Sequence, residues 1–215
     1  MKKQIVLLAL CVASVCSSQE KEERFTITKG NWLLGGSINY SSQKNKEVSG
    51  NTETTGTRLI VSPKVGYAIN DNLVIGTGID YLHANGQIAP ETQFSVPNSK
   101  SNFIGLSPFI TRYFNITKAL LFDVEGQFSY SVGKTENTDI PLSLDSTFLA
   151  INIIPGITYS INNNLAFKLN LGGLSYLRFK AEIESDFSDT KETQDSFGFN
   201  FQTSNLSVGV IYVLR

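Results

Sequence analysis

The sequence predicts an all-β chain that folds as an eight-stranded antiparallel up-and-down transmembrane β-barrel. Apolar and polar side chains alternate with a period of two through eight segments, which is the pattern of strands with two unlike faces. The connections between segments are alternately long and short, as in barrels with tight periplasmic turns and longer outer loops. Charged residues make up 17% of the chain, below the roughly 25% of soluble domains.

The chain begins with a predicted secretory signal peptide, residues 1–18. A lysine pair precedes a mostly apolar run, Ile5–Cys16, which is too short to cross a bilayer as a helix of about 20 residues. Cleavage after Ser18 would remove both cysteines, Cys11 and Cys16, so neither a disulfide nor a thiolate metal site is expected in the exported protein. A lipid-modified Cys16 is the alternative interpretation.

Loss of the signal peptide changes the formal charge from −1 to −3, because two lysines leave with it. No basic surplus then remains for binding nucleic acid through its phosphates. Residues 19–30 begin with a charged stretch and are expected to form a periplasmic lead-in without a fold. Residues 31–215 are expected to form the barrel domain.

Eight segments are predicted to form the strands of the barrel wall. In the clearest one, leucine, valine and aromatic side chains share one face, and Asp123, Glu125 and small polar side chains share the other. The last segment changes parity, because its apolar residues are odd-numbered at first and even-numbered later, and a β-bulge between Thr203 and Leu206 is expected there. The approximate bounds of the segments are 31–42, 57–69, 73–84, 102–114, 119–133, 147–161, 165–180 and 197–214.

The connections carry the residues of tight turns at one end of the barrel. Asn70–Asn72, Asn115–Lys118 and Asn162–Asn164 are short and rich in asparagine, which tolerates the left-handed backbone of turns. The connections at the other end are long and polar, and they are expected to be the outer loops: 43–56, 85–101, 134–146 and 181–196.

Three prolines fall inside predicted strands, where a missing backbone N–H is normally unfavourable. Pro63, Pro108 and Pro155 each precede a turn asparagine by seven residues, so they occupy equivalent places in three hairpins. A local bulge or a skipped bond in the strand ladder is expected at each proline.

The apolar face is predicted to meet lipid, whereas in a soluble lipocalin-like carrier, the alternative, it would point inward. The polar face is rich in small residues such as Gly76 and Gly78, which suit the narrow interior of eight strands. Aromatic side chains also gather near the strand ends on the apolar face, as in interfacial girdles. The expected girdle residues are Trp32, Tyr40, Tyr67, Tyr81, Phe114, Tyr130, Tyr159, Phe179 and Tyr212.

The signal peptide, the four hairpins and the closing segment Asn205–Leu214 resemble the small outer-membrane β-barrel family typified by OmpX and the membrane domain of OmpA. The resemblance covers essentially the whole mature chain, and it implies an outer-membrane location and assembly by the outer-membrane machinery. Such barrels usually end on an aromatic residue, but this chain ends Leu214-Arg215 with Tyr212 nearby.

Seven charged side chains are predicted to project into the lumen and to pair with one another there, because buried charges must be paired. Lys64 is expected to oppose Gly78 and to lie diagonal to Asp80. Asp123 and Lys168 are expected at similar levels above their turns. The full set is Arg58, Lys64, Asp80, Asp123, Glu125, Lys168 and Arg178.

The sequence offers little support for catalysis. Some small outer-membrane barrels modify lipid A with a histidine and a serine near the outer rim, but His83, the only histidine, has no serine beside it. Asp123 and Glu125 form a close carboxylate pair without an identifiable substrate cleft. No cofactor or metal site is expected, and the chain is interpreted as non-enzymatic.

The expected function is therefore that of an outer-membrane barrel with a plugged, charged lumen. Its partners are expected to be outer-membrane lipid and, through the outer loops 43–56, 85–101, 134–146 and 181–196, extracellular or envelope molecules. The alternatives are a lipid A-modifying enzyme and a small pore.

Overall fold

A computed structural model describes residues 25–46, 53–86, 99–137, 143–184, 190–200 and 207–215. The predicted signal peptide, the first part of the lead-in and the predicted bulge at 203–206 lie outside these residues. Within them, no helix is long and apolar enough to cross a membrane. The strands are β1 (Trp32–Lys46), β2 (Glu53–Asn70), β3 (Leu73–Asn85), β4 (Ser99–Asn115), β5 (Leu120–Asn137), β6 (Ser143–Ser160), β7 (Leu165–Asn170), β8 (Gly173–Glu184), β9 (Thr190–Asn200) and β10 (Ser207–Leu214).

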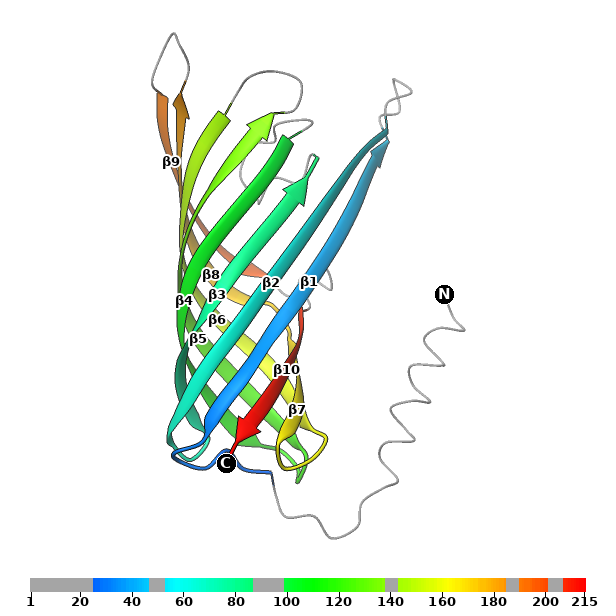
Figure 1. The fold of residues 1–215 in the computed structure, drawn as a ribbon, viewed down its shortest axis with the longest axis vertical. Coiled ribbons are helices and arrows are strands. Elements are labelled where there is room, and N and C mark those ends of the chain that lie inside the picture. Colours follow the sequence, from blue (N-terminus) through cyan, green and yellow to red (C-terminus); the bar gives the residue numbers. More distant parts are fainter. Residues whose placement is uncertain (1–24, 47–52, 87–98, 138–142, 185–189, 201–206) are drawn as a thin grey trace.

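In the half of the barrel that holds the C-terminus, eight strands form a closed ring in which every neighbouring pair is antiparallel (Figure 1). Strands β1 to β6 follow one another around the wall, β7 pairs with β6, β10 pairs with β7, and β1 pairs with β10. In the other half of the barrel, β8 continues β7 beside β6, and β9 pairs with β8, whereas the described residues show no pairing of β9 with β1. Each of the last two predicted segments thus supplies two strands, and the eight-stranded up-and-down barrel is confirmed.

A one-residue bulge separates β7 from β8. Gly156 and Ile153 of β6 are three residues apart, whereas their partners Asn170 and Leu174 are four apart. Gly172 lies in this extra step with φ of 87°, a left-handed conformation that glycine adopts without strain. An inserted residue exchanges the two faces of all that follows on the strand.

Two predictions were wrong because they assumed that β8 keeps the parity of β7 across this bulge. Phe179 is directed into the barrel and is 4% exposed, so it is not part of an interfacial girdle. Arg178 is directed outward, where it pairs with Asp195, so it is not a lumen charge. The glycine pair Gly172-Gly173 was the sequence signal for the bulge.

The predicted parity change in the last segment is confirmed. Phe197 and Phe199 of β9 and Val208 and Val210 of β10 are all exposed on the outside, although the first two are odd-numbered and the others even-numbered. The place where the change occurs lies outside the described residues.

The strands continue further from the turns than the alternation of apolar residues predicts. β1 and β2 stay paired up to Lys46 and Glu53, inside the loop expected at 43–56. β5 and β6 likewise pair up to Glu136 and Ser143. The four predicted outer loops were therefore too long, because strand pairing needs only backbone groups and persists where an apolar face is no longer required.

The predicted tight turns are confirmed at the opposite end, which also holds the C-terminus (Figure 1). Asn72 has φ of 57°, the left-handed conformation expected of a turn asparagine. The Asn162 side-chain oxygen accepts hydrogen bonds from the backbone N–H groups of Asn164 (2.9 Å) and Leu165 (2.8 Å). By the rule that short turns are periplasmic, this is the periplasmic end.

The prolines are accommodated as expected. Pairing between β2 and β3 omits Ser62 and Pro63, and pairing between β4 and β5 omits Ser107 and Pro108, with no change of register across either gap. Pro155 lies on β6 beside the bulge between β7 and β8, and its carbonyl accepts a hydrogen bond from the Leu171 N–H (3.0 Å).

The outside of the barrel is apolar and the inside is polar. Large exposed apolar side chains alternate along the strands on the outside, including Ile38, Ile79, Ile104, Ile151 and Ile153. A surface of this kind is stable only in lipid, and a closed barrel satisfies its backbone hydrogen bonds there. Of the aromatic residues expected in girdles, those beside the periplasmic turns are Trp32, Tyr67, Phe114, Tyr159 and Tyr212, and those further out are Tyr40, Tyr81 and Tyr130.

Candidate functional site in the barrel lumen

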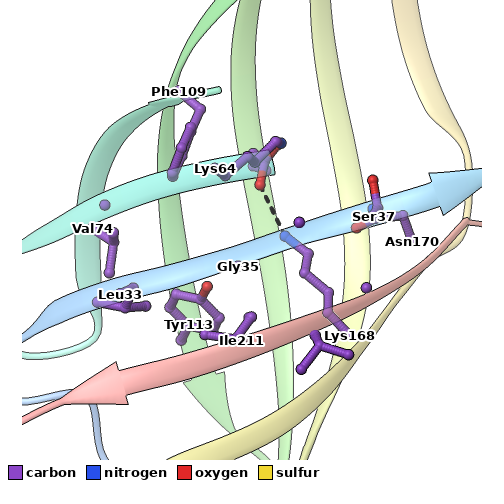
Figure 2. Close-up of a pocket in the computed structure, with 15 residues that line it drawn as sticks. Leu33, Gly35, Ser37, Lys64, Val74, Phe109, Tyr113, Lys168, Asn170 and Ile211 are labelled. Carbon is purple, nitrogen blue, oxygen red and sulfur yellow. Dashed lines mark hydrogen bonds and ion pairs between the residues drawn. The ribbon is translucent and has the colours of Figure 1, made fainter. Parts of the chain in front are cut away.

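Four of the predicted lumen charges meet in one network in the periplasmic half of the barrel. Lys168 of β7 places its Nζ 2.9 Å from Oδ1 of Asp123 and 2.9 Å from Oε2 of Glu125, both on β5. Lys64 of β2 pairs with Oε1 of the same Glu125. Figure 2 shows Lys64 and Lys168 converging from different strands of the wall. Two ammonium groups and two carboxylates give a network without net charge.

The network is buried, and two threonines donate hydrogen bonds to its carboxylates. Asp123 is 0% exposed and Lys168 8% exposed. The Thr158 hydroxyl donates to Oδ2 of Asp123 (2.8 Å), and the Thr111 hydroxyl donates to Oε2 of Glu125 (3.2 Å). Because each of these charges has an oppositely charged partner, burial does not leave an isolated ion, which would cost several kcal/mol.

Glycines opposite the large charged side chains make the network possible. Gly156 is the cross-strand partner of Asp123, and a Cβ atom there would lie 2.8 Å from Oδ1 of that carboxylate. Gly78 is the partner of Lys64, as predicted, and a Cβ atom there would lie 2.9 Å from the lysine Cγ. The small residues of the polar face therefore define the space that the ions fill.

We expect Gly156→Ala to lower the free energy of unfolding by about 1–3 kcal/mol, because the added methyl group overpacks a carboxylate that two partners hold in place. Urea unfolding of the refolded barrel, followed by the fluorescence of Trp32, the only tryptophan, measures this change. Gly126→Ala is the matched control, since its Cβ would face outward with its nearest contact at 3.4 Å. Equal stabilities of the two variants would contradict the packing argument.

An apolar layer closes the lumen on the periplasmic side of the network. Phe25 and Ile27 enter the end of the barrel and are buried there. Backbone bonds hold them to the turns: the Phe25 N–H donates to the Lys118 carbonyl (2.9 Å), and the Asn72 N–H donates to the Ile27 carbonyl (2.8 Å). The buried residues packed with them are Leu33, Ala68, Val74, Tyr113, Leu121, Ala166, Ile211 and Val213. We call Phe25 and Ile27 the N-terminal plug.

The N-terminal plug corrects the prediction of a lead-in without a fold, at least for residues 25–30. The alternation Phe25-Thr26-Ile27 carried the signal, but it is short and follows the charged stretch that begins at Gln19. Hydrogen bonds from asparagines of the turns, such as Asn115 Nδ2 to the Phe25 carbonyl (2.7 Å), are tertiary and have no local sequence pattern.

On the outer side of the network the lumen holds a cavity of about 430 Å³. Arg58 and Asp80, two of the predicted lumen charges, line this cavity and do not join the four-residue network. Lys64 does not pair with Asp80 as the sequence suggested, because Glu125 lies across the lumen within its reach. Phe148 packs between Phe103 and Phe179, with ring centroids 4.9 and 4.7 Å apart, and narrows the lumen on one side.

His83 lies outside the lumen. Its Nδ1 is 2.7 Å from Oδ1 of Asn102, and its Nε2 is 3.0 Å from Nδ2 of Asn85. The carboxylates of Asp123 and Glu125 are both held by Lys168. The described part of the chain contains no group of three or more His, Cys, Asp or Glu side chains arranged to hold a metal ion.

Two outer-membrane proteins of solved structure are similar to this chain. Neisserial surface protein A (NspA) has a similar structure with 16% identity and a TM-score of 0.42, over 86% of this chain and 97% of that chain. A major outer membrane protein from Thermus thermophilus has 11% identity and a TM-score of 0.46, over 86% of this chain and 98% of that chain. No curated protein sequence matches. The outer membrane protein beta-barrel domain family matches residues 7–212, so the chain belongs to that family and resides in the cell outer membrane.

Proposed function

We propose that this protein is a non-enzymatic outer-membrane barrel whose lumen is closed to ions and whose outer loops contact surface or envelope molecules. The observation that supports a closed lumen is that two barriers of different chemistry lie one behind the other in it. The N-terminal plug fills the periplasmic end with apolar side chains, and the network of Lys64, Asp123, Glu125 and Lys168 lies directly beyond.

The two barriers act on ions in different ways. An ion that enters from the outer cavity meets a network whose charges are paired with one another. The network therefore offers no unpaired charge that could replace the water shell of the ion. Behind it, the apolar side chains of Phe25 and Ile27 provide no polar ligand at all. An eight-stranded barrel has an interior that side chains largely fill, and the cavity beside Lys64, Glu125 and Lys168 is only about 50 Å³. This reasoning favours a closed barrel over a small pore.

The non-enzymatic part of the proposal is supported by the use of the reactive side chains in structural contacts. Both ring nitrogens of His83 contact asparagine amides, and the hydrogen bonds described for it include no serine hydroxyl. The carboxylates in the lumen are engaged by lysines. The strands extend as paired β-structure up to the outer loops, which gives these loops a firm base for contacts.

We expect the purified barrel to show no stable channels in planar lipid bilayers, because both barriers span the lumen. The measurement is single-channel conductance at several voltages, with a water-filled porin added to the same bilayers to show that insertion and detection work. Insertion of this protein is checked by its resistance to unfolding in detergent before boiling. Reproducible channels of constant conductance would contradict the proposal and support the small pore.

A further inference from the structure

The lipid-facing wall carries a groove of about 730 Å³ at its outer end. The groove crosses β3 to β6 and β8, and it is separate from the lumen because most of its residues have the outward parity of their strands. Its apolar side is formed by Tyr81, Ile104 and Val132. Lys134 and Lys180 stand on its polar side, together with Asp145 and Glu182.

The strand register shows how the wall changes from apolar to charged here. Val132 pairs with Thr147, which pairs with Lys180. One step further from the membrane, Lys134 pairs with Asp145, which pairs with Glu182. On the membrane side of these rows the outward residues of β6 are Leu149, Ile151 and Ile153. On β5 and β6 the charged row thus begins where the outward apolar residues end, and on β8 Lys180 lies one row beyond the outward Arg178–Asp195 ion pair.

The groove has a surplus of positive charge. Glu182 is neutralised by Lys191, whose Nζ lies 3.0 Å from its Oε1. Among the ion pairs of the described residues none involves Lys134 or Lys180, and both side chains are exposed. Asp145 is the only other charged residue of the groove, so two ammonium groups face one carboxylate.

We propose that this groove binds a phosphorylated lipid of the outer leaflet, with its phosphate between Lys134 and Lys180 and its acyl chains over Ile104 and Val132. Lipid is the occupant because the wall belongs to a barrel in the outer membrane, and the loops at this end identify the outer leaflet. An ammonium group binds phosphate as a point charge, and long lysine side chains reach the headgroup level from an apolar surface. Tyr81 has the amphipathic ring of an interfacial residue.

The test measures lipid retention by the whole barrel in neutral detergent with native mass spectrometry. The probes are diphosphorylated lipid A and the same lipid after removal of its phosphates. Wild-type protein is expected to bind the phosphorylated form about tenfold more tightly, because two exposed charge-assisted contacts are lost with the phosphates. Equal binding of the two lipids would overturn the proposal without any variant.

The variant Lys134→Gln/Lys180→Gln is expected to lose this preference for the phosphorylated lipid. Lys118→Gln is the matched control, since it makes the same change at an exposed lysine of a periplasmic turn. Heat-modifiable migration on gels shows that each variant is a closed barrel. Equal lipid binding by the double variant and the control would overturn the assignment of the lysines. Inorganic phosphate at the same concentration is expected not to displace the lipid, and displacement would overturn the choice of a lipid over free phosphate.

Discussion

Replacing Lys168 with methionine is expected to lower the free energy of unfolding by about 3–5 kcal/mol, because it leaves two buried carboxylates with a single ammonium partner. Asp123 loses its only ion-pair contact among the described residues, and Glu125 keeps only Lys64. The methionine side chain has similar length, so the loss reflects charge more than volume. Urea unfolding of the barrel in detergent, followed by Trp32 fluorescence, measures the change.

Two further variants separate charge balance from a general effect of the substitution. Lys118→Met makes the same change at an exposed turn residue and is expected to stay within about 0.5 kcal/mol of wild type. Lys168→Met/Asp123→Asn restores neutrality, because Lys64 and Glu125 remain as a pair, and it is expected to recover part of the loss. A single variant as stable as the Lys118 control would show that the network is not held by charge pairing.

Replacing Ile27 with alanine is expected to destabilise the barrel by about 2–5 kcal/mol, because it opens a cavity in a fully buried position. Ile27 is 0% exposed and packs among the residues that close the periplasmic end. The same unfolding measurement applies, and Trp32 stands at the start of β1, close to the altered layer.

Ile116→Ala is the control for this substitution, because Ile116 is 57% exposed in a periplasmic turn. It removes the same atoms with little change in buried area, so we expect an effect below about 1 kcal/mol. If the two variants were equally stable, residues 25–27 would not be packed in the barrel, and the lead-in would be the unfolded segment that the sequence suggested.

Most of the fold was predictable because each strand of this barrel has two chemically distinct faces. The lipid face, the lumen face and the asparagine-rich turns all leave local patterns in the sequence. The parity of β8 was not predictable from such a pattern alone, because one extra residue at Gly172 exchanges the faces of everything after it. The outer strand ends were also missed, since pairing continues there without apolar alternation.

The lumen residues were predictable as a set, but their contacts were not. Parity placed Lys64, Asp123, Glu125 and Lys168 on the inner face, and the structure brings them together. Parity does not determine which side chains reach one another across the lumen, because that depends on the curvature and shear of the closed wall. Lys64 therefore pairs with Glu125 on the far wall, although Asp80 is the nearer carboxylate by register.

The continuation of the strands beyond the apolar band sets the height at which this protein meets its surroundings. β5 is paired with β6 from Leu120 to Glu136. At a rise of about 3.4 Å per residue and a tilt of about 40° from the barrel axis, this paired stretch is roughly 40 Å tall along the axis. On the outer face of β5 the last apolar residue is Val132, so the four residues from Val132 to Glu136 carry the hydrogen-bonded wall roughly 10 Å beyond the apolar band. Paired backbone beyond the hydrocarbon therefore holds together the two ends of the loop between β5 and β6, where molecules outside the membrane can reach them.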